Sequence, residues 1–205
     1  MKANTQPFES RVKPLAADSV TLVSGLPRSG TSMMMRMLAA GGMPVTTDNI
    51  RKPNEDNPHG YFELERIKQL EKDNAWLKEE KGRAIKAISA LLPLLPDDLF
   101  YYVIFMERRM TEILASQKKM LLRRGTEESD AIPDELMASK YRTYLEATYQ
   151  WLERQPHFHV LYIHYSDIIK DPGGGAGDVN AFLPHPLDEA KMAAAVDPNL
   201  YRQRQ

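Results

Sequence analysis

The sequence contains no cysteine, which excludes disulfides, thiolate metal sites and cysteine nucleophiles. It also has no apolar run close to the roughly 20 residues that a membrane-spanning helix needs. Residues 1–14, MKANTQPFESRVKP, lack the apolar stretch of a secretory signal. We therefore expect a cytoplasmic protein that has no membrane as a partner.

A strong charge of one sign is also missing. Lys and Arg together number 27 and Asp and Glu 28, so the formal net charge is -1. This balance argues against a nucleic-acid partner, and any anion site must be a local cluster of donors. The length of 205 residues suits one domain. We expect that domain to span residues 1–205, with the polar residues 1–18 as an N-terminal arm.

The pattern that is present alternates short apolar runs with helical segments. The expected strands are residues 19–24, 83–88, 99–106 and 158–164. The expected helices are residues 31–40, 61–81, 111–124 and 134–154, with short helices in 166–205, an irregular loop at 43–60 and a flexible glycine linker at 173–177. Strands that alternate with helices favour an α/β fold with a central parallel sheet flanked by helices in three layers.

The strongest local motif is the segment GLPRSGTS at 25–32, which follows an expected strand and opens an expected helix. Gly25 and Gly30 have the spacing of a P-loop, in which backbone N–H groups converge on an anion at a helix N-terminus. Nucleotide triphosphatases carry a Lys where Thr31 stands, and the only cation inside this loop is Arg28. A plain strand-to-helix turn is the alternative interpretation.

Pro27–Ser32, PRSGTS, resembles the 5′-phosphosulfate loop of sulfotransferases that use 3′-phosphoadenosine 5′-phosphosulfate (PAPS), where the usual form is Pro-Lys/Arg-Ser-Gly-Thr-Thr. In that family the Lys or Arg contacts the 5′-phosphate and the transferring sulfuryl group. The resemblance gives this role to Arg28, whose guanidinium can stabilise charge on the bridging oxygen. The resemblance implies that the donor is bound here by Arg28, Ser29, Gly30, Thr31 and Ser32.

A second segment matches the part of the family that binds the donor's 3′-phosphate. Arg108 follows the expected strand that ends at Met106, and Ser116 comes eight residues later, as in the family. Met110 stands where the family often has Pro. Arg109 is an alternative phosphate ligand, and both arginines are otherwise ordinary solvated charges. Cations are unfavourable at a helix start, so this pair points to an anionic partner.

The C-terminal part adds two further similarities. Val160–Pro172 resembles the family's late strand and its Tyr-Glu-Asp-Leu-Leu-x-Asp-Pro continuation, with Ser166 in place of Glu. The tail also resembles bacterial members, and Arg202 would then close over the 3′-phosphate. A solvated terminal arginine is an equally good interpretation of Arg202.

Sulfuryl transfer to a hydroxyl needs a base, and the family uses either His or Glu. The segment NPHGYFE at 57–63 resembles bacterial sulfotransferase-like proteins and offers both His59 and Glu63. We expect Glu63 in the first turn of the next helix, where the dipole alone would favour a carboxylate, and we favour it over His59. Lys86 resembles the Lys that many members place near donor and acceptor; a solvated Lys is the alternative.

The resemblance implies a transferase that moves a sulfuryl group from PAPS to an acceptor hydroxyl or amine by in-line transfer, without a metal. The acceptor would be a small molecule or a glycan. A P-loop nucleotide kinase is an alternative, although it would need the missing loop Lys and a Mg²⁺-binding Asp at a strand end. A sulfotransferase-like protein that binds nucleotide without catalysis is another. His157 and His159 alternate on a strand without a suitable carboxylate, so we expect no metal site.

Overall fold

The computed structural model describes residues 16–48, 50–54, 57–123, 125 and 132–200. Its centre is a sheet of four strands in the order β2-β1-β3-β4, and every pair of neighbours runs parallel. The strands are β1 (Ser19–Gly25), β2 (Ala84–Lys86), β3 (Phe100–Glu107) and β4 (Phe158–His164). All four lie within a residue or two of the expected runs, except that β2 is shorter than the expected strand at 83–88.

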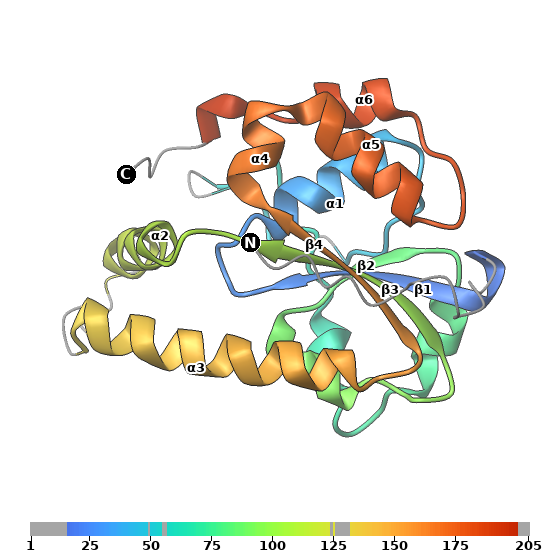
Figure 1. Cartoon of the computed structure of the whole chain (residues 1–205), viewed down its shortest axis with the longest axis horizontal. Coiled ribbons are helices and arrows are strands. Elements are labelled where there is room, and N and C mark those ends of the chain that lie inside the picture. The colour runs from blue at the N-terminus through green and yellow to red at the C-terminus, as the bar shows by residue number, and fades with distance from the viewer. Residues whose placement is uncertain (1–15, 49, 55–56, 124, 126–131, 201–205) are drawn as a thin grey trace.

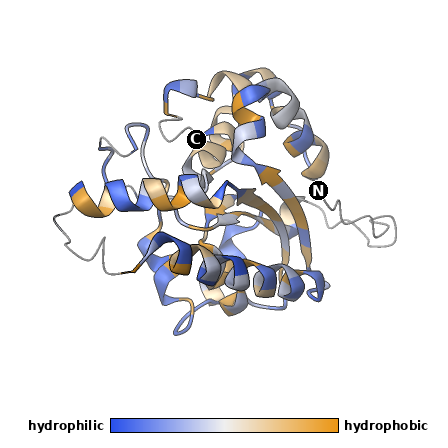
Figure 2. Ribbon diagram, turned by 60° about the vertical axis from the view of Figure 1, so that its left-hand side comes forward, coloured by the Kyte–Doolittle hydropathy of each residue, from blue (hydrophilic) through white to orange (hydrophobic). Residues whose placement is uncertain are grey.

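Both faces of the sheet are buried, which explains why its strands are apolar without alternation. Along β3, Tyr101 and Val103 enter one hydrophobic core, whereas Tyr102 and Ile104 enter the other. All four side chains are fully buried. Figure 2 shows hydrophobic colour along the central strands, between two helical layers.

One layer consists of α1 (Thr31–Ala40), α4 (Tyr165–Lys170), α5 (Pro172–Phe182) and α6 (Glu189–Ala194), which together cover one face of the sheet (Figure 1). Helix α1 is placed at its centre by contacts with β1, β2 and α6. Four buried methionines of α1 fill the space between it and its neighbours, a role that suits their flexible side chains: Met33, Met34, Met35 and Met37.

The opposite layer is built from the long helix α3 (Asp134–Glu153) and three 3₁₀ segments, η3 (Glu65–Gln69), η4 (Ala75–Glu80) and η5 (Ser89–Leu94). Helix α2 (Met110–Arg123) follows β3 at one end of the sheet and contacts α3 (Figure 1). The short segments η2 (Ala16–Asp18) and η7 (Pro198–Leu200) complete the described chain. The result is the expected α/β sandwich of three layers. None of the helices described is both long and apolar enough to cross a membrane.

The helix expected at 61–81 is wrong, because η3 and η4 are separated by a turn. The Asp73 carboxylate accepts a hydrogen bond from Ala75 N, and its carbonyl accepts one from the Trp76 indole. The Asn74 amide donates to Leu94 O at 3.2 Å. Such local side-chain bonds compete with helical hydrogen bonds. The apolar residues of this segment nevertheless pack against the sheet as expected, including Ile67 and Leu70.

The flexible linker expected at 173–177 is also wrong, because these glycines lie inside α5. The helix is started by Asp171, whose carboxylate accepts a hydrogen bond from Gly174 N at 2.9 Å, and by Pro172 at its first position. A Cβ on Gly175 would lie only 3.0 Å from Ile168 Cγ1 of α4. The glycines therefore allow two consecutive helices to pack closely.

The N-terminal arm expected at residues 1–18 falls mostly on residues 1–15, which lie outside the described residues.

Candidate active site

The site lies where the chain reverses its direction across the sheet. Strand β1 lies between β2 and β3, so the chain continues first to one side of β1 and later to the other. In parallel sheets, such a point leaves a crevice at the carboxyl ends of the strands. The predicted residues Arg28, Lys86 and Arg108 follow or end β1, β2 and β3, and the topology therefore brings them to one edge.

The loop after β1 requires glycine at two positions. Gly25 has φ 138° and Gly30 has φ 108°, both in the region that side chains disfavour. A Cβ on Gly25 would lie 2.5 Å from Met106 O of β3. A Cβ on Gly30 would lie 2.5 Å from Cδ2 of Tyr165, the first residue of α4. The loop is thus pressed between β3 and α4, with the N-terminus of α1 opening at Gly30.

The two predicted phosphate sites are in direct contact through Arg28. Its Nε donates to Ser116 Oγ of α2 at 2.9 Å, and its carbonyl accepts a bond from Arg108 Nη1 at 3.1 Å. Arg28 also has a left-handed φ of 75°, which costs a non-glycine residue roughly 1 kcal/mol or more. Arg28 therefore connects the loop after β1 to the segment that follows β3, through its bonds with Ser116 and Arg108.

Arg108 is the better placed of the two arginines proposed for the second site. Its Nε lies 2.9 Å from Glu112 Oε2, and the two side chains are only 8% and 1% exposed. Its guanidinium also lies 4.5 Å from the ring centre of Tyr165. Arg109 is exposed and does not line the cavity described below, whereas Arg108 does. Geometry favours Arg108; its role as a ligand stays a prediction.

On the β2 side, Lys86 is surrounded by polar atoms. Its Nζ donates to Tyr61 O at 2.8 Å and to Ser32 Oγ at 3.1 Å, and it lies 3.7 Å from Glu63 Oε1. Burial is the largest cause that lowers the pKa of Lys86 to about 8, and the nearby Glu63 opposes it. This ammonium therefore connects the first turn of α1 to the loop that carries Glu63.

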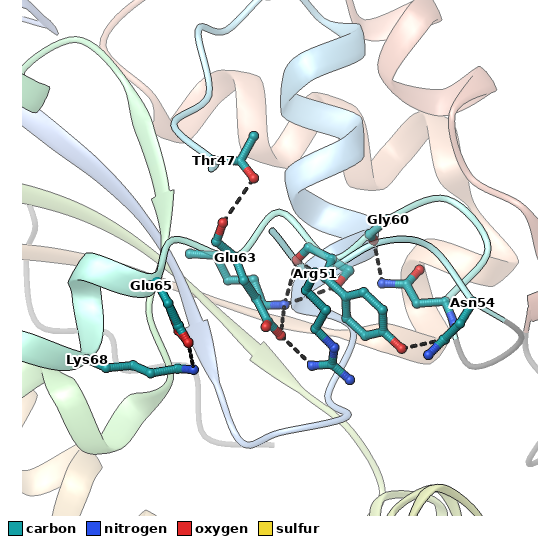
Figure 3. A network of polar contacts seen from close by, with 11 residues as sticks. Thr47, Arg51, Asn54, Gly60, Glu63, Glu65 and Lys68 are labelled. Carbon is teal, nitrogen blue, oxygen red and sulfur yellow. Dashed lines mark hydrogen bonds and ion pairs between the residues drawn. The ribbon is translucent and has the colours of Figure 1, made fainter. Parts of the chain in front are cut away.

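Glu63 does not lie in a helix, contrary to expectation, but in irregular chain before η3. Its Oε1 accepts a bond from Arg51 Nη1 at 2.8 Å, and its carbonyl accepts one from Thr47 Oγ1 at 3.0 Å (Figure 3). The preceding residue, Phe62, has a left-handed φ of 50°. Within the described chain, Phe62 and Arg28 are the two non-glycine residues with positive φ. Backbone strain of this kind concentrates at functional sites.

His59 lies apart from this cluster. It is exposed, and its Nε2 is 3.1 Å from Asp197 Oδ2, ahead of η7. It lines a second cavity of about 410 Å³ that shares Arg51, Tyr61 and Glu63 with the first. The geometry therefore puts Glu63, and not His59, beside Arg28 and Lys86.

A single cavity of about 390 Å³ unites the central residues of the site. The predicted residues that line it are Arg28, Gly30, Thr31, Ser32, Glu63, Lys86 and Arg108. Ser29 is a buried residue of the loop, Ser116 contacts Arg28, and Arg202 lies outside the described residues. No group of three or more His, Asp or Glu side chains within the described ranges could hold a metal ion. That the protein needs no metal stays a prediction.

The lining residues that were not predicted from the sequence include Arg36, Arg51, Tyr61 and Tyr165. Tyr61 belongs to the segment that suggested Glu63, and its ring lies 3.5 Å from Arg51 Cζ. Arg36 is in the second turn of α1, the helix that follows the loop, and its Nε donates to Ala195 O at 2.7 Å. Helical spacing could have drawn attention to Arg36, but nothing in the sequence marks Arg51.

The fold and the site define an α/β protein with a cationic crevice at the carboxyl edge of its parallel sheet. The family model of the sulfotransferase domain matches residues 18–199, and the chain belongs to this family. Family membership supports sulfuryl transfer as the general activity. Comparison with curated proteins found no match.

Two solved structures are similar to the chain. One is the sulfotransferase domain from the Synechococcus PCC 7002 olefin synthase, at 16% identity and a TM-score of 0.50, over 95% of this chain and 91% of that one. The other is the sulfotransferase domain from the curacin biosynthetic pathway, at 15% identity and a TM-score of 0.47, over 93% of this chain and 86% of that one. At this identity, the first likeness shows the shared fold.

Proposed function

We propose that the protein transfers a sulfuryl group from PAPS to an acceptor hydroxyl or amine. One observation carries the proposal: Arg28, Lys86 and Arg108 come from the ends of three adjacent strands and line the same cavity. A donor with several anionic groups needs such a set of cations around a phosphate loop. Because the donor is consumed in the reaction, it is a substrate.

The order of the strands suggests how the donor lies. The phosphate loop after β1 would bind the 5′-phosphosulfate, with the N-terminus of α1 and the hydroxyls of Thr31 and Ser32 as donors. Arg108 and Ser116 follow β3, on one side of this loop, and would bind the 3′-phosphate. Lys86 and Glu63 lie on the other side, next to β2. That side is left for the acceptor.

In the proposed reaction, the sulfuryl group leaves the bridging oxygen of the donor's phosphate and bonds to the acceptor oxygen. The acceptor proton passes to the Glu63 carboxylate, and adenosine 3′,5′-bisphosphate is released. Arg28 would stabilise the charge that develops on the bridging oxygen, since a preorganised donor acts most strongly where charge appears. The Lys86 ammonium, close to Ser32, would add to this stabilisation. The acceptor is proposed to be a small molecule or a glycan.

A nucleotide kinase fits the site less well. Thr31 occupies the position of the loop Lys, and the carboxylate at the end of β3, Glu107, accepts a bond from Tyr149 OH at 2.8 Å. Glu107 does not line the cavity. A kinase holds Mg²⁺ with an acidic group directed at the phosphates.

Calorimetry with three nucleotides tests the proposal. Adenosine 3′,5′-bisphosphate should bind without metal, in the presence of EDTA, and much more tightly than adenosine 5′-phosphate. Equal affinity for these two would contradict the two phosphate sites, and a preference for ATP with Mg²⁺ would favour a kinase. Turnover of PAPS with a panel of hydroxyl and amine acceptors then separates an enzyme from a protein that only binds nucleotide.

A further inference from the structure

The acceptor side of the cavity has a defined order of groups. Lys86 Nζ donates a hydrogen bond to Ser32 Oγ at 3.1 Å and lies 3.7 Å from Glu63 Oε1. The same Glu63 oxygen accepts a hydrogen bond from Arg51 Nη1 at 2.8 Å. This series starts at the phosphate loop and runs away from Ser116, which lies across the loop on α2. Arg51 is therefore beyond the proposed base, on the side opposite the second phosphate site.

The Arg51 guanidinium is held in one orientation by the Tyr61 ring and the Glu63 carboxylate. It stacks 3.5 Å from the centre of the Tyr61 ring, and the Tyr61 hydroxyl is fixed by a 2.6 Å bond to Asn54 Oδ1. Only Nη1 is engaged, by Glu63; Nε and Nη2 have no partner among the described residues (Figure 3). The side chain is 31% exposed and lines both cavities. An oriented guanidinium of this kind is suited to a carboxylate.

Charge and shape add to this picture. Two cations, Arg51 and Lys86, share the carboxylate of Glu63, so the described side chains around Glu63 carry an excess of positive charge. The wall beside it is apolar and consists of side chains around η3 and η5: Leu64, Ile67, Ile88 and Leu91. Ile88 is 39% exposed. A ligand here would need both an anion and an apolar body.

Resting on the proposed sulfuryl transfer, we infer that the acceptor is an amphipathic hydroxy acid whose carboxylate binds Arg51. Its hydroxyl faces Glu63 and its apolar body lies against Ile88 and Leu91. Because Arg51 Nη1 and Glu63 Oε1 are 2.8 Å apart, the carboxylate and the hydroxyl must be close neighbours in the acceptor. A long spacer between them would not fit.

Three matched acceptors test the inference: 3-hydroxydecanoate, its methyl ester, and 10-hydroxydecanoate. The ester keeps the hydroxyl and the chain but lacks the charge, whereas 10-hydroxydecanoate keeps the charge with the wrong spacing. We expect kcat/KM with PAPS to be roughly tenfold or more higher for 3-hydroxydecanoate than for either, the scale of a hydrogen bond to a charged group. In Arg51→Gln the ratio of acid to ester should fall close to one, and Arg51→Lys should keep part of it.

Arg66→Gln is the matched control. Arg66 also stacks over an aromatic ring, at 5.1 Å from Trp76, and pairs with a carboxylate, Asp73, at 3.1 Å. It does not line the cavity, so its substitution should leave the ratio unchanged. Equal rates for acid and ester in the wild type, or a preference that survives Arg51→Gln, would overturn the inference.

Calorimetry with the same acceptors separates this inference from the proposed function. Acid and ester are titrated into the protein saturated with adenosine 3′,5′-bisphosphate, and into the free protein. If no sulfuryl transfer occurs but the acid still binds more tightly through Arg51, the anion site stands and the proposed reaction fails. If transfer occurs without preference for the acid, the reaction stands and the anion site fails. Binding of neither acceptor to either form would refute the site.

Discussion

Arg28 Nε donates a hydrogen bond to Ser116 Oγ at 2.9 Å, across 88 positions of the sequence. The bond joins the loop after β1 to the second turn of α2, and Arg108 reinforces it by donating to the carbonyl of Arg28. Two motifs that are far apart in the sequence are therefore in direct contact. The contact fixes the position of Arg28 relative to the segment that follows β3.

Removing the Arg28 side chain should mainly affect turnover. Arg28→Ala should lower kcat with PAPS by roughly 10²-fold or more, as expected for the loss of one preorganised donor. Arg28→Lys keeps the charge but not the geometry of Nε, so its kcat should lie between those of the wild type and Arg28→Ala. Single-turnover rates report the chemical step directly. Near-normal turnover in Arg28→Ala would refute the role of this residue.

Ser116→Ala should instead reveal itself in nucleotide selectivity. We expect the affinity for adenosine 3′,5′-bisphosphate to fall roughly tenfold while that for adenosine 5′-phosphate stays nearly constant. Ser89→Ala is a suitable control. Ser89 is also buried and accepts a 3.0 Å hydrogen bond from Tyr144 OH, but it does not line the cavity. An equal loss for both nucleotides would place Ser116 away from the 3′-phosphate.

The identity of the base can be decided by two isosteric changes. Glu63→Gln keeps shape and hydrogen bonding but removes the base, and should slow transfer roughly 10²–10⁴-fold with nucleotide binding intact. His59→Asn should be much milder, because His59 does not itself line the cavity of Arg28 and contacts it only through Asp197. An inactive His59 variant beside an active Glu63 variant would reverse the roles. If both stay active, the acceptor side has been assigned wrongly.

Lys86 should introduce a pH dependence near neutrality. Its pKa is lowered to about 8, chiefly by burial, so the ammonium is lost as pH rises through that value. If the charge supports the donor, kcat/KM should decline between pH 7 and pH 9, values roughly one unit either side of that pKa. Lys86→Arg keeps the charge and should remove this decline. A decline of the same size in both proteins would assign the titration to another group.

The lowered pKa of Lys86 should also affect stability, which should rise with pH over a range in which kcat/KM falls. Between pH about 8 and 10.5, the unfolded chain still binds the proton that the folded protein has lost, so stability gains with rising pH. The gain is at most about 1.4 kcal/mol per pH unit. Urea unfolding of wild type and Lys86→Met across this window should show the wild type improving relative to the variant. A constant difference would mean that the pKa of Lys86 is not lowered.

The sequence reveals the sheet well because a buried parallel strand is apolar on both sides. The runs at 19–24 and 99–106 show this, and their boundaries agree with β1 and β3 to within a residue or two. The segment 61–81 misleads because Ile67 and Leu70 do contact the core, but as parts of 3₁₀ segments. Apolar spacing reports which residues are buried more reliably than which backbone conformation carries them.

The site divides in a similar way. Residues of one continuous motif, such as Arg28 and Ser32, can be identified because the loop's function depends on local spacing. Lys86 and Arg108 lie on either side of that loop because β2 and β3 are the neighbours of β1 in the sheet. No short segment of the sequence determines this strand order. Arg51 could not have been found at all, because its position depends on the path of an irregular loop over Tyr61.

The glycine-rich start of α5 provides a test of the corrected fold. Gly173 and Gly174 are adjacent and both helical, but a Cβ on Gly173 would lie an ordinary 3.7 Å from Asp171 Oδ1, whereas a Cβ on Gly174 would overlap Asp171 Oδ2. Gly173→Ala should therefore raise the free energy of unfolding, by up to about 1 kcal/mol, through better helix propensity. Gly174→Ala should lower it by about 1 kcal/mol, because Asp171 must leave its capping position.

Thermal and urea unfolding of the two variants measure this difference directly. A flexible linker would tolerate alanine at either position with the same small effect, because neither residue would have a fixed neighbour. Opposite signs at adjacent glycines require the ordered helix start that Asp171 caps. Asp171→Ala provides the complementary change: it removes the cap and the overlap together, so Gly174→Ala should no longer be destabilising in that background. If Gly174→Ala costs the same with and without Asp171, the carboxylate is not the group that the new methyl displaces.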